Sequence, residues 1–167
     1  VRFLEVAQPA RPLAVTGPLR VLAMIASPKD LPALNVEVEK QRLERALEDL
    51  QASGQVELTW LEGQTWRDLQ REMRPGPGPW HVFPFIGHGS YDPQRGEGFL
   101  AVADRQGEVY PLWASQLGRM LADHRSLRLV LLNACEGAQG GQIDIYSSAA
   151  ATLVRRGVPA VVAMQYE

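Results

Sequence analysis

The chain has 167 residues, of which 46% are apolar and 22% charged, and its formal net charge is −2. This length suits one domain with a buried core, and the composition is that of an ordinary globular protein. The lack of a basic excess argues against nucleic acid or an anionic membrane as partner. The single cysteine excludes an internal disulfide and a multi-cysteine metal site, and with no recognisable signal peptide it favours a reducing, cytoplasmic location.

Apolar patterns along the chain predict strands that alternate with helices. Residues 1–18 are proline-rich and predict a linker with at most an edge strand. Strands are predicted over residues 19–26, 55–61, 80–86, 127–132 and 158–164. Helices are predicted over residues 35–52, 65–73, 112–123 and 144–156, the first two capped by Asn35 and Thr65. A hairpin is predicted between residues 97–103 and 108–110. This order predicts an α/β fold with a mostly parallel central sheet covered on both faces.

Two of the predicted strands are followed by residues that could form a catalytic pair. His88 lies between two glycines directly after one strand, and Cys135 follows another. The carboxyl ends of parallel strands meet at one sheet edge, which is where sites are built in such folds. An imidazole next to a thiol can take its proton and make it a nucleophile. The N–H groups of Gly89 and Cys135 would then supply an oxyanion hole. A backbone carbonyl or a neighbour such as Asp92 would have to orient His88.

Other readings of these residues remain open at this point. A lone cysteine after a buried strand is usually a small core residue, and a lone histidine in a glycine-rich turn is usually a hydrogen-bonded loop residue. The combination of the two at equivalent strand ends is what favours catalysis. Glu136 and Asp144 could form a pocket for a basic side chain, although Asp144 suits a helix cap equally well. The remaining histidines, His81 and His124, are interpreted as structural or surface residues.

Three segments resemble the CHAT domain, a caspase-like family of clan CD cysteine peptidases: FIGHGSYD, VLLNACEGAQGG and YSSAAATLVRRGVPAVVAMQY. The resemblance runs over residues 19–167 and implies a caspase-like three-layer α/β/α sandwich. It implies that His88 and Cys135 match the catalytic dyad and that Gly89 matches the oxyanion donor. Metacaspase-like relatives have an aspartate two residues before the cysteine, which contacts a basic P1 side chain. This chain has Asn133 there, so that preference does not carry over.

The resemblance also suggests a wider context for the domain. CHAT domains commonly follow tetratricopeptide repeats in bacterial proteins, and caspase-like domains often need a partner, or the release of an inhibitory segment, before they cut. The family fold continues further, so we expect an incomplete domain within a longer polypeptide.

The sequence thus predicts a cysteine endopeptidase that acts on protein or peptide substrates and needs no cofactor or metal. The first alternative is a latent or non-catalytic interaction module with the same fold. The second is a flavodoxin-like nucleotide or phosphate binder, which needs a glycine-rich loop between a strand and a helix; Ala26-Ser27-Pro28-Lys29 is a poor version of that loop.

Overall fold

The computed structural model describes residues 15–74, 78–134 and 145–165 of the chain. Its strands are β1 (Leu19–Ile25), β2 (Val56–Trp60), β3 (Val82–Asp92), β4 (Glu97–Ala103), β5 (Val109–Trp113), β6 (Leu129–Ala134) and β7 (Val161–Gln165). Its helices are α1 (Val36–Ala52), α2 (Trp66–Glu72), α3 (Ala114–Ala122) and α4 (Ile145–Arg155).

The strands form one mostly parallel sheet. β1 pairs in parallel with β2 and β3, and β6 pairs in parallel with β3 and β7. The hairpin of β4 and β5 joins the sheet in antiparallel fashion through β3. The predicted α/β fold with a mostly parallel central sheet is therefore confirmed, and so is the predicted hairpin.

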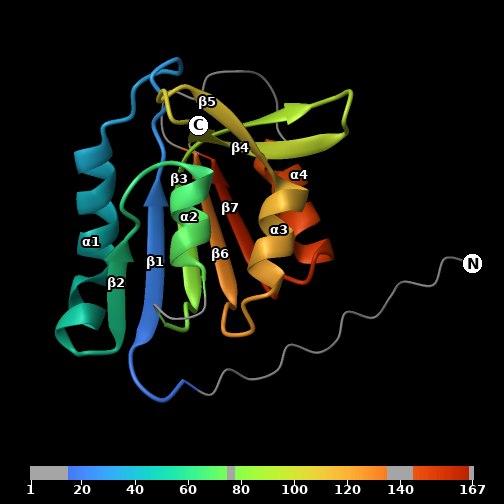
Figure 1. Ribbon diagram of the computed structural model, residues 1–167. Helices are drawn as coiled ribbons and strands as arrows, with labels where there is room; N and C mark the ends of the chain where they lie inside the picture. The colour runs from blue at the N-terminus through green and yellow to red at the C-terminus, as the bar shows by residue number, and fades with distance from the viewer. Residues whose placement is uncertain (1–14, 75–77, 135–144, 166–167) are drawn as a thin grey trace, which may run out of the picture.

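Side chains of β1 and β3 alternate between two cores on opposite faces of the sheet. Met24 and Phe85 belong to the larger cluster, which residues of α2, α3 and α4 complete. Ile25 and Ile86, the next residue of each strand, belong to a smaller cluster that includes Leu43 of α1. Because successive side chains of a strand point to opposite faces, helices cover both sides of the sheet, in three layers (Figure 1). This arrangement agrees with a caspase-like sandwich.

The two predicted helix caps are present. The side chain of Asn35 accepts the N–H of Val38 at the start of α1. Thr65 and Asp68 form a reciprocal capping box at the start of α2. Such caps satisfy N–H groups that have no partner within the helix, which explains why both helices begin where the sequence predicts.

Several predicted boundaries differ from the structure, since β3, β6 and β7 begin two to three residues later than predicted. Two further differences have a clear cause. The strand expected to end at residue 86 continues to Asp92, because its last five residues pair with β4. The helix expected from residue 112 begins at Ala114, because Leu112 and Trp113 pair with β4 as the end of β5. In both places pairing with a distant strand decides the structure, and local apolar spacing does not reveal it.

No helix in the described ranges combines the length and apolar character needed to cross a membrane.

Candidate functional site

His88 lies inside β3, at the point where the pairing of that strand changes. Gly87 is the last residue of the parallel register and pairs with Ala134 of β6, whereas His88 is the first of the antiparallel register and pairs with Ala101 of β4. The predicted position in a turn just past the strand was therefore wrong. His88 nevertheless lies where the parallel part of the sheet ends. It is 4% exposed, so its ring is held by the protein on nearly all sides.

The imidazole of His88 is oriented by a backbone carbonyl. Nε2 lies 2.8 Å from the carbonyl oxygen of Pro32, in the loop between β1 and α1. A carbonyl oxygen can only accept a hydrogen bond, so Nε2 carries the proton and donates. In the neutral ring the lone pair is then on Nδ1. Nδ1 is therefore the nitrogen that can take a proton from a neighbouring group.

The loop that carries Pro32 is closed on itself at its base. The hydroxyl oxygen of Ser27 accepts the N–H of Leu34 at 3.1 Å. The N–H of Ser27 donates in turn to the side-chain carbonyl oxygen of Gln64 at 2.7 Å. Leu34 is buried in the smaller core. Ser27 before Pro32 and Leu34 after it are thus bonded to each other, which fixes both ends of the loop.

Asp92, the side chain considered as an orienting partner for His88, has a different role in the structure. Its carboxylate accepts the N–H groups of Gln94 and Arg95 at 2.8 and 3.2 Å. It thereby stabilises the turn between β3 and β4. The carbonyl of Pro32 is the group that contacts His88.

The glycines on either side of His88 are both strand residues. Gly87 is packed so closely that a Cβ there would lie 2.7 Å from Cζ of Phe85 and 3.0 Å from the carbonyl oxygen of Ala26. Its small size is needed for packing within the protein. Gly89 is half-buried and pairs with Leu100 of β4.

Asn133 lies on the same face of the sheet as His88. It pairs with Ile86 in the parallel register, and His88 is two residues further along β3 than Ile86. Its side-chain oxygen Oδ1 is buried and has no hydrogen-bond partner among the residues that the structure describes. A buried acceptor without a partner is costly, so this oxygen is available for a donor.

Cys135, Glu136 and Asp144 lie outside the described residues. Their predicted roles as nucleophile and substrate-binding residues stay predictions. In the sequence, Cys135 directly follows Ala134, the residue that pairs with Gly87.

The other two histidines have structural hydrogen bonds. Nδ1 of His81 accepts the N–H of Arg20 at 2.9 Å and so joins the start of β1 to the start of β3. Burial lowers the pKa of His81, and the nearby Arg20 and Arg128 guanidinium groups lower it further. His124 donates through Nε2 to the carbonyl oxygen of Met73. Neither of these hydrogen bonds involves His88 or Pro32.

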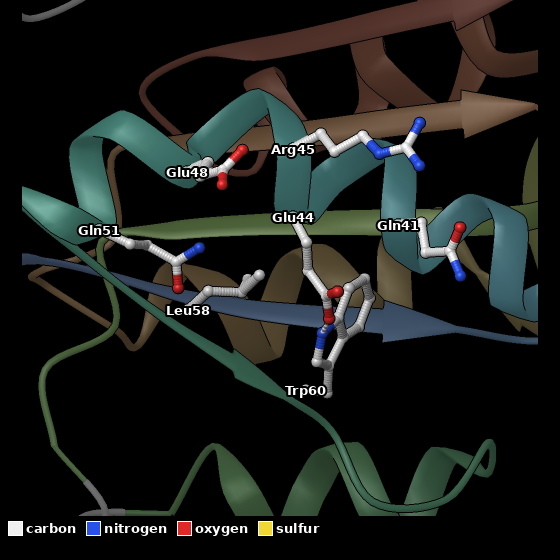
Figure 2. A pocket seen from close by; sticks show the side chains of 7 residues that line it. All are labelled: Gln41, Glu44, Arg45, Glu48, Gln51, Leu58 and Trp60. Atoms are coloured by element: carbon white, nitrogen blue, oxygen red, sulfur yellow. Dashed lines mark hydrogen bonds between the residues drawn. The ribbon is translucent and has the colours of Figure 1, made fainter.

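A surface groove lies between α1 and the edge strand β2, away from these residues. Figure 2 shows its lining, in which the Trp60 side chain projects toward Glu44. The indole N–H of Trp60 donates to the Glu44 carboxylate at 2.9 Å. No predicted site residue lines this groove: its walls are Gln41, Glu44, Arg45, Glu48, Gln51, Leu58 and Trp60.

The sequence did not reveal the part played by Pro32. Any residue can present a carbonyl group, so its side chain carries no signal for this role.

The family model of the CHAT domain matches residues 4–167 of the chain. A search of curated proteins found no match to the chain.

Proposed function

Because the chain belongs to the CHAT domain family, whose fold is that of caspase-like peptidases, we propose that it is a cysteine endopeptidase. Cys135 is the nucleophile and His88 is the general base and acid. The substrate is a peptide bond of a protein. The hydrogen bond between His88 and the Pro32 carbonyl is the observation that supports this proposal most strongly.

The orientation of His88 suits the first chemical step. Nδ1 of the neutral ring accepts the proton of the Cys135 thiol, and the sulfur attacks the peptide carbonyl carbon. The imidazolium that forms keeps its Nε2–H bond to Pro32, because that group carries a proton in both charge states. A hydrogen bond from a charged donor is stronger than one from a neutral donor, so the Pro32 carbonyl stabilises the ion pair of thiolate and imidazolium.

The later steps return the enzyme to its starting state. The imidazolium gives its proton to the leaving amine as the C–N bond breaks, which leaves a thioester on Cys135. His88 then takes a proton from water, which attacks the thioester and releases the carboxylic acid and the thiol. The N–H groups of Gly89 and Cys135 hold the developing oxyanion.

Substrate recognition at this sheet edge would use the remaining predicted residues. Oδ1 of Asn133, which has no hydrogen-bond partner within the described ranges, supports a role as acceptor for a donor on the substrate. Glu136 and Asp144 would add negative charge nearby. Asp92 takes part in a turn four residues beyond His88, and it is proposed only as a residue at the rim of the site.

We propose that the activity is controlled by segments other than the 167 residues of this sequence. Tetratricopeptide repeats of the same polypeptide or a regulatory protein would switch the peptidase on in the cytoplasm, where a catalytic thiol stays reduced.

The proposed function can be tested with a peptidyl acyloxymethyl ketone, which alkylates an activated thiol. Mass spectrometry after brief treatment should find an adduct on Cys135 of the wild type. His88→Ala should lose at least about 99% of the initial alkylation rate, and Cys135→Ala should show no adduct. An adduct that forms equally fast without His88 would contradict the dyad. If neither this chain nor a polypeptide that includes its flanking repeats reacts, the non-catalytic interaction module is the correct interpretation.

A further inference from the structure

The loop that presents Pro32 to His88 is also held by the hairpin of β4 and β5. Oδ1 of Asp30 accepts the N–H of Val109, the first residue of β5, at 2.9 Å. The two residues are 79 positions apart in the chain. This contact fixes the middle of the loop, whereas Ser27 and Leu34 fix its two ends.

Two other contacts join the same loop and hairpin. The N–H of Lys29 donates to the carbonyl oxygen of Gly107 at 2.9 Å. The ammonium group of Lys29 lies 3.4 Å from the Glu108 carboxylate, with both side chains more than half exposed. Exposed ion pairs of this kind contribute little. The bond from Val109 to Asp30 is exposed too, but it joins a carboxylate acceptor to a backbone N–H of the hairpin, and such a bond is stronger than one between neutral groups. Asp30 is therefore the side chain that joins the loop most directly to the hairpin.

The path from Asp30 to His88 is short. A single residue separates Asp30 from Pro32, and the N–H of Leu31 donates back to the carbonyl of Pro28 at 3.2 Å. This turn limits how far Pro32 can move relative to Asp30. The loop is thus held at Asp30 on one side and at the His88 ring on the other.

We propose that Asp30 is a positioning residue for His88. Its carboxylate holds the loop against the hairpin and thereby keeps the Pro32 carbonyl on Nε2 of His88. The importance of this contact for catalysis rests on the proposed function, but the effect on the His88 ring does not. A movement of the hairpin of β4 and β5 would therefore also shift the Pro32 carbonyl, and with it the ring of His88, the proposed general base.

The first test measures the His88 ring directly. In ¹⁵N-histidine-labelled protein, the Nε2 proton of His88 should exchange slowly with water, because it is buried and bonded. Asp30→Ala should speed this exchange at least about threefold. Asp30→Asn keeps an oxygen acceptor and should restore most of the protection. Glu108→Gln removes only the exposed ion pair and is the matched control, with no change expected. Circular dichroism would verify that every variant keeps the wild-type fold.

The second test measures Cys135 alkylation in the same variants. We expect the rate to fall at least about threefold in Asp30→Ala and to recover in Asp30→Asn. If the Nε2 proton of His88 is equally protected in folded Asp30→Ala, the positioning role of Asp30 is wrong. If that proton responds but wild-type Cys135 does not react, the proposed peptidase activity fails and the positioning role stands.

Discussion

The carbonyl oxygen of Pro32 lies 2.8 Å from Nε2 of His88, although 56 residues separate them in the chain. A backbone group therefore determines which nitrogen of this imidazole carries the proton. A catalytic aspartate would add a negative charge to the site, whereas a carbonyl adds only a dipole. The ring is held in the same tautomer in either case.

The first prediction follows because His88 is oriented by the backbone carbonyl of Pro32 and not by a side chain. Pro32→Ala keeps the carbonyl group, so the rate of Cys135 alkylation should stay within about threefold of the wild type. His88→Asn removes the base and should lower that rate by at least about 100-fold. His124→Asn is the control, because His124 contacts Met73 and not the site. A large loss in Pro32→Ala with an intact fold would mean that the proline ring itself acts in the site.

The second prediction concerns the glycine before His88. In Gly87→Ala the new methyl group would meet the fully buried ring of Phe85 and the carbonyl oxygen of Ala26 at 3.0 Å or less. We expect a loss of about 1–3 kcal/mol in the free energy of unfolding, measured by urea denaturation. Phe85→Leu lowers stability by itself, because Phe85 is fully buried, but in that background Gly87→Ala should cost less than in the wild type, since one of the two clashing groups is gone. Unchanged stability in Gly87→Ala would show that β3 can shift without cost.

Much of the architecture could be predicted from the sequence because its signals are local. Asn35 and Thr65 mark helix starts through their own side chains, and the short apolar run around Val130, bounded by polar residues, has the length that is typical of a buried parallel strand. The end of β3 could not be predicted in this way. Its residues His88 to Asp92 form a strand only because β4 comes back beside them.

In the candidate site, too, some residues have a local signal in the sequence and others have none. His88 is recognisable as a candidate because its imidazole and the thiol of Cys135 follow two apolar runs in the sequence, so that the two groups could meet at one sheet edge. Pro32 and Asp30 are not, because one acts through its backbone and the other contacts a backbone N–H 79 residues away. Contacts that depend on the main chain of a distant element leave no pattern in a single sequence.

The third prediction is a dependence of stability on pH through His81. Its pKa in the folded protein is below the ordinary value of 6.5, first because of burial. As the pH falls through 6.5, the unfolded chain takes up a proton at this position before the folded protein does. The contribution of His81 to the free energy of unfolding is therefore fully present above pH 6.5. It is lost as the pH falls below 6.5, by at most about 1.4 kcal/mol per pH unit for one proton.

The variant that checks this third prediction is His81→Asn. Its amide oxygen can still accept the N–H of Arg20, which Nδ1 of His81 accepts in the wild type, but it does not titrate. Melting temperatures measured from pH 8 to pH 5 should fall less in His81→Asn than in the wild type. Equal slopes in the two proteins would assign the loss to other groups.

The last prediction compares the two helix caps. At α2 the Thr65 hydroxyl donates to the Asp68 carboxylate at 2.6 Å, and the N–H of Asp68 donates back to that hydroxyl at 3.2 Å. Burial alone would raise the pKa of Asp68, but the bonds from Thr65 and the Arg71 guanidinium lower it overall. The stabilisation that Asp68 contributes is therefore present at neutral pH and is lost as the pH falls below about 3.8.

Thr65→Ala should lower the free energy of unfolding by about 1–2 kcal/mol at pH 7. It removes both of these hydrogen bonds at the start of α2, a helix whose Leu69 is fully buried in the core. Asn35→Ala removes the single cap bond of α1 and should cost about 0.5–1 kcal/mol. Urea denaturation at pH 7 would measure both, and an equal or smaller loss in Thr65→Ala would show that the capping box adds nothing to a simple cap.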